Sequence, residues 1–180
     1  MKIRLRSLRK SDAKKMLEWM HDEDICKCFE KDFASYSLED AELFCLRAKT
    51  KTLKKDGDSL HLAIVDEDDE YLGTISLKNY DQYSKKVEYA IAMRKRAQGT
   101  GAAYKATKEL INMAFFRFDV CSIYLMVLNE NSRAIRFYEK CGFRREGTPG
   151  KNIEKSGSAQ KQLLYVLFRD EYLERERKEE

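Results

Sequence analysis

The sequence predicts an α/β protein in which a mixed central β-sheet is flanked by helices. Segments whose apolar and polar residues alternate, as in half-buried strands, are interleaved with segments whose apolar residues recur at helical spacing. The one proline is Pro149, and no linker, internal repeat or low-complexity block divides the 180 residues. We therefore assign residues 1–180 to a single domain, with a charged C-terminal tail from about residue 170.

The first half of the chain predicts a strand, then helices, then three further strands. In chain order these are a strand at 3–8, a helix at 13–20 capped by Ser11, a short helix at 24–29, a helix from Ser37 to about Lys54, and strands at 60–65, 71–77 and 87–93. Ser37 and Asp40 have the spacing of a capping box. Residues 66–70 and 79–86 are expected to form the turns that join the last three strands.

The second half predicts two more helices and two more strands. Thr100 is expected to cap a long helix with an apolar stripe, and residues 123–127 alternate as in a strand. Asn131 is expected to cap a short helix that ends at Gly142, since a glycine suits the left-handed position after a helix. Residues 162–168 complete the pattern as the last strand.

Charge and cysteine content argue against several classes of function. The 35 lysines and arginines are interspersed with 31 aspartates and glutamates, whereas nucleic-acid-binding proteins usually gather basic residues on one face. The five cysteines form no C-x-x-C pair, and two histidines are too few to complete a zinc site with them. No apolar run approaches the roughly 20 residues of a membrane helix, and the N-terminus lacks a signal-peptide core. We expect a cytoplasmic protein with free thiols, no metal, and no nucleic-acid or membrane partner.

A loop with two glycines is the first candidate for a binding site. Gly99 and Gly101 lie between the strand at 87–93 and the helix that follows Thr100. Free N–H groups at a helix N-terminus attract phosphate, and glycines let a phosphate approach the backbone. The basic run Arg94-Lys95-Arg96 is expected to add positive potential. The loop matches neither of the common nucleotide-binding patterns, and a tight turn without a ligand has about equal weight.

Asn131 and Tyr138 form the second candidate. They are seven residues apart, so they share one face of the short helix at a separation of about 10 Å along its axis. Such a face can line a narrow channel with an amide at one end and a phenol at the other. For this helix by itself, an N-cap asparagine and a core tyrosine are the simpler interpretation.

Together the two segments resemble the GNAT superfamily of acyl-CoA-dependent N-acetyltransferases. Arg96-Ala97-Gln98-Gly99-Thr100-Gly101 matches the phosphate-loop pattern of that family, Q/R-x-x-G-x-G/A. The downstream pattern N-x-x-A-x-x-x-Y-x-K-x-G-F is matched from Asn131 to Phe143. The resemblance covers the chain from the first strand to Tyr165. It implies the branch that contains ribosomal-protein N-terminal acetyltransferases and spermidine N-acetyltransferases.

The resemblance implies acetyl-CoA as the cosubstrate. The pyrophosphate is expected on the loop at 98–104, and the pantetheine arm along the exposed edge of the strand at 91–93. The residues expected to contact the coenzyme are Ile91, Ala92, Met93, Arg96, Gln98, Gly99, Thr100, Gly101, Ala102, Ala103, Asn131, Arg133 and Lys140.

The resemblance also implies that a primary amine attacks the thioester carbonyl directly. Tyr138 is expected to protonate the leaving thiolate, and a backbone N–H of residues 91–93 to stabilise the oxyanion. Because an alkylamine with a pKa near 10.4 is protonated at neutral pH, a base is needed as well. Glu88 is the candidate base, ordered water is the alternative base, and an ordinary surface glutamate is an equally weighted interpretation of Glu88.

The acceptor is less well defined by the sequence. Glu30 and Asp32 lie between the first helices, where this family lines its acceptor cleft. Carboxylates there would suit a small cationic amine such as a polyamine or an amino sugar, although ordinary surface charge is the stronger interpretation. A protein N-terminus is a further acceptor class. The alternative to an enzyme is a catalytically silent CoA-binding module with this fold, and a homodimer is expected because dimers are common in the branch.

Overall fold

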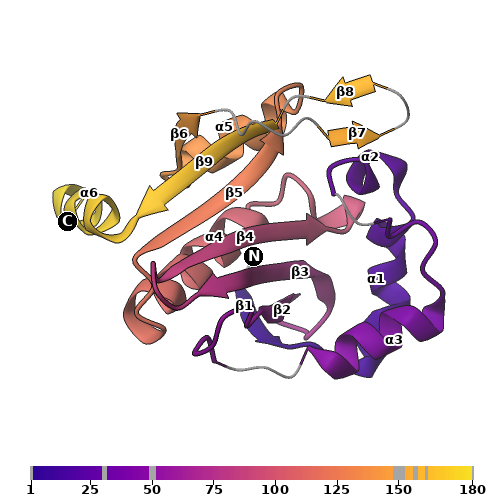
Figure 1. Cartoon of the computed structure of the whole chain (residues 1–180). Coiled ribbons are helices and arrows are strands. Elements are labelled where there is room, and N and C mark those ends of the chain that lie inside the picture. Colours follow the sequence, from indigo (N-terminus) through magenta and orange to yellow (C-terminus); the bar gives the residue numbers. More distant parts are fainter. Residues whose placement is uncertain are drawn as a thin grey trace.

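A mixed seven-stranded sheet forms the centre of the computed structural model, which describes residues 2–29, 32–48, 52–147, 153–155, 158–160 and 162–179 (Figure 1). The strand order is β1-β2-β3-β4-β5-β9-β6, and each neighbouring pair is antiparallel except β4 and β5, which are parallel. The strands are β1 (Ile3–Ser7), β2 (Leu60–Asp66), β3 (Tyr71–Asp81), β4 (Lys86–Met93), β5 (Ser122–Leu128), β6 (Arg144–Gly147) and β9 (Gln162–Phe168), with a separate hairpin of β7 (Ile153–Lys155) and β8 (Ser158–Gln160). The expected α/β class with a mixed sheet is confirmed.

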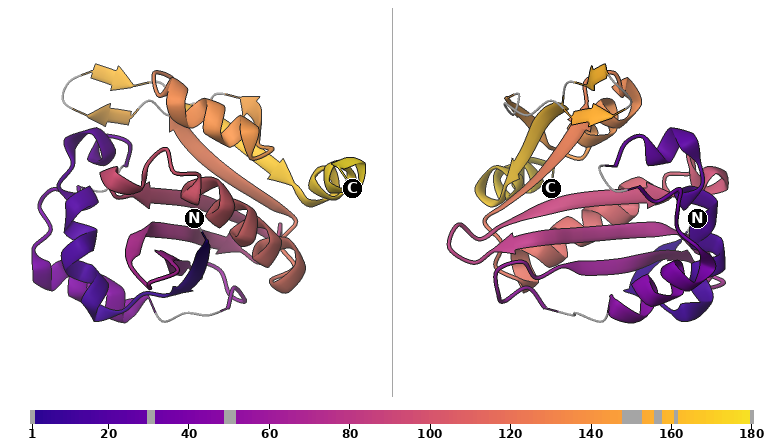
Figure 2. Two further views of the ribbon diagram at one scale, coloured as in Figure 1. Left: turned by 180° about the vertical axis from the view of Figure 1, so that it is seen from behind. Right: turned by 45° about the vertical axis from the view of Figure 1, so that its right-hand side comes forward.

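Helices cover the two faces of the sheet unequally. On one face lie α4 (Ala102–Asn112) and α5 (Ser132–Lys140), behind the strands in Figure 1 and in front of them in the left panel of Figure 2. On the other face, α1 (Ala13–Met20) and α3 (Leu38–Arg47) pack at one end of the sheet. The remaining helical segments are η1 (Lys10–Asp12), α2 (Glu23–Cys26), η2 (Lys95–Ala97), the π-helical turn η3 (Met113–Arg117) and α6 (Arg169–Glu179).

The alternation of side chains along the strands divides the core into two hydrophobic clusters. On β2, Leu62 and Ile64 belong to the larger cluster, together with Leu110 of α4. Ala63 and Val65 of the same strand pack into the smaller cluster, with residues of α1 and α3. Because both faces of β2 are covered, its sequence is apolar at nearly every position rather than alternating.

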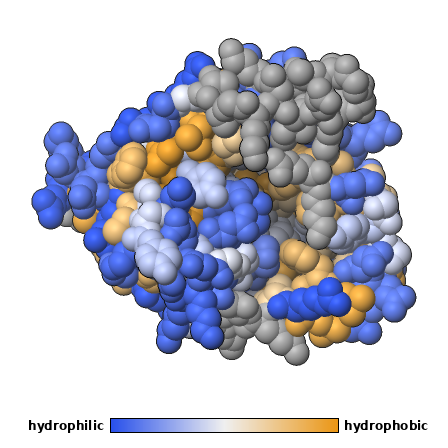
Figure 3. Space-filling model, in the orientation of Figure 1, coloured by the Kyte–Doolittle hydropathy of each residue, from blue (hydrophilic) through white to orange (hydrophobic). Residues whose placement is uncertain are grey.

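The face of β5 and β9 that points away from α5 carries hydrophobic side chains at the surface (Figure 3). In Figure 1, no helix is drawn in front of these two strands. The half-buried residues on this face are Tyr124, Met126, Leu128, Leu164 and Phe168. Their exposure follows from the placement of α1 and α3, which cover the same face only near β2 and β3.

The two halves of the sheet separate between β4 and β5. Their parallel ladder comprises three residue pairs, Lys86–Ser122, Val87–Ile123 and Glu88–Tyr124. The ladder between β3 and β4, in contrast, continues as far as Gly73–Met93. Beyond Glu88 the two strands diverge, as Figure 1 and the right panel of Figure 2 show. Among the described strands, residues 89–93 of β4 therefore have a partner on the β3 side alone.

Two helix boundaries in the first half differ from the sequence expectation. The helix α1 is capped by Asp12, the last residue of the preceding turn η1, rather than by Ser11. The helix α3 has the expected capping box but ends at Arg47 rather than at about Lys54. The reason is that Ala48 leaves the helical conformation, with a ψ of 39°. Residues 49–51 lie outside the described part of the chain.

The charged C-terminal tail expected from about residue 170, for which the sequence also allows a frayed helix, forms the helix α6. Tyr172 anchors that helix and is 2% exposed. Its hydroxyl donates to Asn112 Oδ1 of α4 at 2.9 Å, and Lys108 Nζ lies 4.7 Å from the centre of its ring. One buried aromatic side chain thus attaches this highly charged helix to the domain.

Strand boundaries also differ. The strand β3 continues to Asp81, so the turn expected at 79–86 is confined to residues 82–85. The register of β3 and β4 shifts between Lys78 and Asp81, where Asn79 has a positive φ of 53°. The strand β6 and the hairpin of β7 and β8 were not expected, because their polar sequences show no apolar alternation.

Candidate active site

The loop between β4 and α4 has the geometry of an anion-binding turn. Gly99 and Gly101 have φ values of 77° and 82°, in the left-handed region that favours glycine, and no atom lies within 4 Å of the Cβ position at either. Gly101, rather than the expected Thr100, caps α4, while the Thr100 hydroxyl donates to a carbonyl oxygen of η2 at 2.8 Å. Ala102 and Ala103 begin the helix. Their N–H groups have no carbonyl one turn earlier in the helix, and that of Ala102 makes a long hydrogen bond of 3.4 Å to Thr100 Oγ1, so this end of α4 can donate to a phosphate.

The positive charge near the loop comes from Lys95 and Arg96, both exposed, and not from Arg94. The Arg94 side chain is buried and forms ion pairs with Glu18 and Glu70, each at 2.7 Å. These carboxylates neutralise its charge, so the expectation that Arg94 adds positive potential to the loop is wrong. Arg96 lies 3.4 Å from Glu70 and keeps most of its side chain in solvent.

Hydrogen bonds bring α5 to the loop. Arg133 Nη1 donates to Gln98 Oε1 at 3.0 Å, and Gln98 Nε2 donates to the carbonyl oxygen of Met93 at 3.4 Å. Lys140, at the far end of α5, places its ammonium 5.0 Å from the ring centre of Tyr104 in the first turn of α4. Three residues that the sequence assigned to the coenzyme, Gln98, Arg133 and Lys140, therefore lie around the start of α4.

Asn131 is the N-cap of α5, as its sequence position predicts. Its Oδ1 accepts a hydrogen bond from the N–H of Ala134 at 3.0 Å. Its Nδ2 points to another element, because it donates to Cys28 Sγ, just beyond α2, at 3.4 Å. The oxygen of the Asn131 side chain thus caps α5, while its NH₂ group points to the region between α2 and α5.

Tyr138 is held within a group of aromatic rings. Its ring centre lies 5.9 Å from that of Tyr89 on β4 and 6.1 Å from that of Phe143, both in edge-to-face arrangements. Burial raises the pKa of the Tyr138 hydroxyl above its ordinary value of 10, and the nearby thiols of Cys28 and Cys141 act in the same direction. The hydroxyl is therefore protonated at neutral pH and can act as a proton donor.

Cys28 is a site residue that the sequence reasoning missed. Its thiol accepts from Asn131 Nδ2 and raises the pKa of Tyr138, so it lies close to both residues of the second candidate. The thiol also lies 3.5 Å from the carbonyl oxygen of Asp24. No sequence pattern around a single cysteine indicates that it lies in a binding or catalytic site. The place of Cys28 follows from its contact with Asn131 in the folded protein.

Residues 91–93 of β4, where the sequence places the pantetheine arm, pair closely with β3. Ile91, Ala92 and Met93 pair with Ile75, Thr74 and Gly73. A Cβ atom at Gly73 would lie 2.4 Å from the carbonyl oxygen of Ala92, which a side chain cannot do without displacing the backbone. Gly73 therefore allows β3 to lie close to residues 91–93 of β4. On their other side, these residues of β4 have no strand partner among the described residues.

Glu88 lies where the β4–β5 ladder ends. Its carboxylate forms an ion pair with Lys78 Nζ at 2.8 Å and accepts from Asn79 Nδ2 at 2.8 Å. Because successive side chains of a strand point to opposite faces, Glu88 and Tyr89 project from opposite faces of β4. The structure thus brings Tyr138 to Tyr89 and leaves Glu88 on the other face, paired with β3 side chains.

The two expected acceptor residues are only partly covered by the structure. Glu30 lies outside the described residues. Asp32 is exposed, and its Oδ1 accepts from the N–H of Ala34 at 3.1 Å. Beside it, Phe33 packs edge-to-face against Trp19 at 5.3 Å and against Phe29 at 5.5 Å. An aromatic cluster therefore lies next to Cys28 and Asp32.

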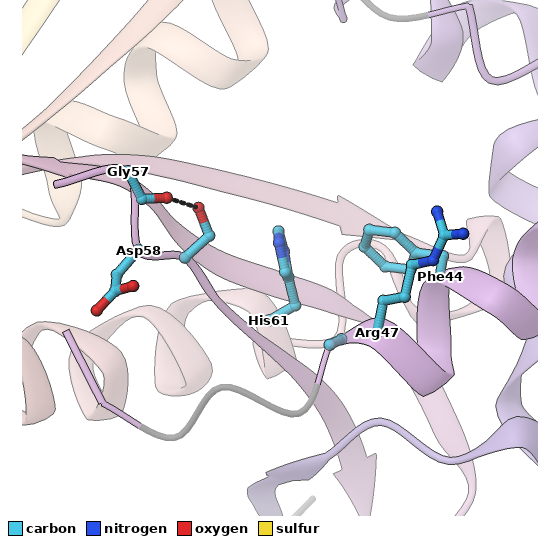
Figure 4. Close-up of a pocket in the computed structure, with 7 residues that line it drawn as sticks. Phe44, Arg47, Gly57, Asp58 and His61 are labelled. Atoms are coloured by element: carbon cyan, nitrogen blue, oxygen red, sulfur yellow. Dashed lines mark hydrogen bonds between the residues drawn. The ribbon is translucent and has the colours of Figure 1, made fainter. Parts of the chain in front are cut away.

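A pocket at the end of α3 is distinct from these residues (Figure 4). It is lined by Phe44, Arg47, Ala48, Gly57, Asp58, Ser59 and His61. The His61 ring lies 5.0 Å from that of Phe44, and its Nδ1 lies 2.8 Å from Ser76 Oγ. In Figure 4, the side chains of Phe44, Arg47 and His61 point to one side and Asp58 to another. None of the residues expected to bind coenzyme or acceptor lines this pocket.

The left-handed glycine loop, the separated strands β4 and β5, and the capped helix that carries Tyr138 agree with the GNAT resemblance of the sequence. A family model described as an acetyltransferase (GNAT) domain matches residues 2–144, which is most of the chain. The chain belongs to this family.

Individual relatives agree with that assignment. The chain is similar to the spermidine N(1)-acetyltransferase of Escherichia coli strain K12, with 28% identity over 61% of this chain and 59% of that protein. It is also similar to the putative ribosomal N-acetyltransferase YdaF of Bacillus subtilis, with 32% identity over 56% of this chain and 55% of that protein. The match thus spans less than two thirds of the length of these curated relatives.

A solved structure shows the same fold over nearly the whole chain. The spermidine N-acetyltransferase of Vibrio cholerae, in complex with CoA and spermine, superposes with a TM-score of 0.83 and 21% identity, covering 96% of this chain and 98% of that one. Among the residues that the structure describes, no helix is long and apolar enough to cross a membrane. Within the same residues, no three His, Cys, Asp or Glu side chains are grouped so that they could hold a metal ion.

Proposed function

We propose that this protein transfers the acetyl group of acetyl-CoA to a primary amine, which attacks the thioester carbonyl directly. One observation carries the proposal: the loop with left-handed Gly99 and Gly101 adjoins the edge of β4 that β5 leaves without a partner. The helix that holds Asn131 and Tyr138 is hydrogen-bonded to the same loop. Membership of the GNAT family supports the same class of reaction.

The residues around the loop suit a diphosphate ester. Backbone N–H groups from Gly99 to Ala103 would donate to the phosphate oxygens, and Lys95 and Arg96 would add positive charge. The open space at the Cβ positions of Gly99 and Gly101 leaves room for the phosphate to reach the backbone. The free edge at residues 91–93 would pair with the amide groups of the pantetheine arm, as an extended peptide pairs with a sheet edge.

Tyr138 would donate the proton that the leaving thiolate needs. At the reference pKa values of about 10 for a phenol and 8.5 for a thiol, this transfer costs about 2 kcal/mol, and the raised pKa of Tyr138 increases the cost. An uphill transfer of this size requires the thiolate to be held against the hydroxyl. Ring contacts with Tyr89 and Phe143 fix the position of Tyr138 for that purpose.

The amine must lose a proton before or during its attack. The Glu88 carboxylate projects from the face of β4 opposite Tyr89, and it is paired with Lys78. We therefore assign Glu88 a role as the final proton acceptor, reached through ordered water rather than by contact with the amine.

The acceptor that we favour is a small cationic amine of the polyamine or amino-sugar class, and a protein N-terminus is the other acceptor class. Asp32 offers an exposed carboxylate, and the neighbouring rings of Phe29 and Phe33 offer a surface for an alkyl chain or for its ammonium groups. The names of the two curated relatives support these two classes, one acting on spermidine and the other described as ribosomal. We also propose that the protein forms a homodimer, which light scattering would test.

Thiol release from acetyl-CoA, measured with a panel of polyamines, amino sugars and N-terminal peptides, tests the activity. We expect turnover with at least one amine, and Tyr138→Phe should lower kcat more than it raises KM, because the phenol acts on the leaving group. An unchanged kcat would remove Tyr138 from the role of proton donor. Turnover with none of the amines, together with CoA binding in calorimetry, would support the alternative of a catalytically silent CoA-binding module.

A further inference from the structure

Arg94, the residue that follows β4, bonds through its side chain to α1, to the turn between β2 and β3, and to the first residue of β3. Its Nε and Nη2 donate to the two carboxylate oxygens of Glu18 on α1, each at 2.7 Å. Its Nη1 donates to Glu70 Oε1 in the turn between β2 and β3, and to the carbonyl oxygen of Tyr71, both at 2.7 Å. The side chain is 6% exposed. Every guanidinium nitrogen is thus bonded within the protein, and the Glu70 oxygen that accepts from Nη1 also lies 3.4 Å from Arg96 Nη2.

The backbone of Arg94 is fixed as well. Its N–H donates to the carbonyl oxygen of Leu72 at 2.9 Å, and its own carbonyl oxygen accepts from the N–H of Ala97 at 2.9 Å. Four residues, 95–98, separate Arg94 from Gly99. Because one end of this short segment is held by both backbone and side chain, the place of the Gly99 and Gly101 amides depends on Arg94.

We propose that Arg94 is a positioning residue for the coenzyme: without touching it, Arg94 clamps the phosphate loop to α1 and to the turn between β2 and β3. The inference rests on the proposed function, since it assumes that CoA binds this loop. A lysine cannot reproduce the clamp, because a single ammonium lacks the planar fork that spans Glu18 and Glu70.

Arg6 on β1 provides a matched control within the same chain. Its Nη1 and Nη2 donate to the two carboxylate oxygens of Asp12 at 2.7 and 2.9 Å, and its Nε donates to Asp69 at 2.8 Å. Its side chain is 10% exposed. Asp69 and Glu70 are neighbours in one turn, so the two arginines hold that turn in the same way. Arg6, however, connects it to η1 and not to the phosphate loop.

The test compares Arg94→Met with Arg6→Met. Glu18 is already 51% exposed beside Arg94 and can be hydrated when Arg94 is replaced, while Glu70 keeps its ion pairs with Lys15 and Arg96, so Arg94→Met is expected to fold. Arg6→Met leaves Asp12, which is 5% exposed, without its guanidinium partner. The control variant should therefore lose at least as much stability as the test variant.

Titration calorimetry with CoA, steady-state kinetics and thermal unfolding give the readouts. For Arg94→Met we expect CoA to bind at least tenfold more weakly (about 1.4 kcal/mol) and KM for acetyl-CoA to rise in parallel, while kcat and KM for the amine change less than about threefold. Arg94→Lys should recover less than half of the loss. For Arg6→Met we expect a lower Tm with CoA affinity within about twofold of wild type. If Arg6→Met does not fold, Arg6→Lys takes its place as the control.

Two results would overturn the inference while leaving the proposed function intact. One is wild-type affinity for CoA in Arg94→Met, and the other is an equal loss of affinity in the Arg6 variant, which would indicate a general effect of stability. A wild-type protein that binds no CoA would overturn the proposed function itself, and the role of Arg94 with it.

Discussion

Substitution of Gly99 by alanine tests separately the left-handed backbone conformation of the loop and its proposed binding of CoA. Gly99 has a φ of 77°, and no atom lies within 4 Å of its Cβ position. An added methyl group therefore meets no neighbour in the free protein, and the cost is that of a left-handed alanine, about 1–2 kcal/mol. For a chain of this length we expect Tm to fall by roughly 2–8 °C.

Gly57 offers a control with the same backbone conformation. Its φ is 81°, its Cβ position is equally open, and its N–H donates to the carbonyl oxygen of Tyr80 at 2.9 Å, at the end of β3 opposite to the one that pairs with Met93. Gly57→Ala should lose as much stability as Gly99→Ala. It should leave CoA binding unchanged, because alanine keeps the N–H group and the site is remote.

Thermal unfolding and titration calorimetry on both variants give the comparison. We expect Gly99→Ala to weaken CoA binding at least tenfold, since its methyl group occupies the space through which a phosphate reaches the backbone. The reasoning would be refuted by wild-type CoA affinity in Gly99→Ala, or by equal losses of affinity in both glycine variants.

Other predictions concern the parts of the fold that hold the site. Tyr172→Phe removes the hydrogen bond to Asn112 and should cost about 1 kcal/mol of unfolding free energy, whereas Tyr172→Ala should cost about 3–5 kcal/mol and release α6; a smaller effect in urea unfolding would show that α6 is not anchored there. Burial raises the pKa of the Cys141 thiol to about 12. The folded state therefore holds this proton more tightly than the unfolded chain does. The contribution of the protonated thiol to the free energy of unfolding is complete below about pH 9 and is lost as the pH rises toward 12. In denaturant titrations between about pH 9 and 11, the free energy of unfolding should fall less for Cys141→Ala than for wild type. Equal falls would show that the Cys141 thiol does not cause this pH dependence.

Much of the fold could be predicted because its elements carry strong local signals. The helix α5 has Asn131 as its N-cap and is followed by Gly142 with a φ of 101°, both as the sequence indicates. Strand β9 has the predicted bounds, since seven consecutive mostly apolar residues are flanked by charge. Signals of this kind depend on neighbouring residues alone and do not require the tertiary structure.

The features that were missed depend on contacts between distant residues. The helix α6 is polar apart from Tyr172 and Leu173, and its anchoring depends on the contact of Tyr172 with α4, which its own sequence does not show. Arg94 was expected at the phosphate loop because it precedes Arg96 in a basic run, yet Glu18, 76 positions earlier, draws it to α1. Likewise, the contact of Cys28 with Asn131 joins residues 103 positions apart, which no local pattern encodes.

The short ladder between β4 and β5 also bears on whether a strand of another molecule can pair with the open edge of β4. A row of unsatisfied N–H and C=O groups on an outer strand is a template for pairing with another molecule, and proteins usually blunt such edges. Here the unpaired stretch, residues 89–93, belongs to the fourth of seven strands and lies inside a wedge whose other wall is β5. The N–H and C=O groups of this stretch can thus form hydrogen bonds with a narrow ligand inside the wedge, whereas a strand of a neighbouring molecule is too wide to reach them.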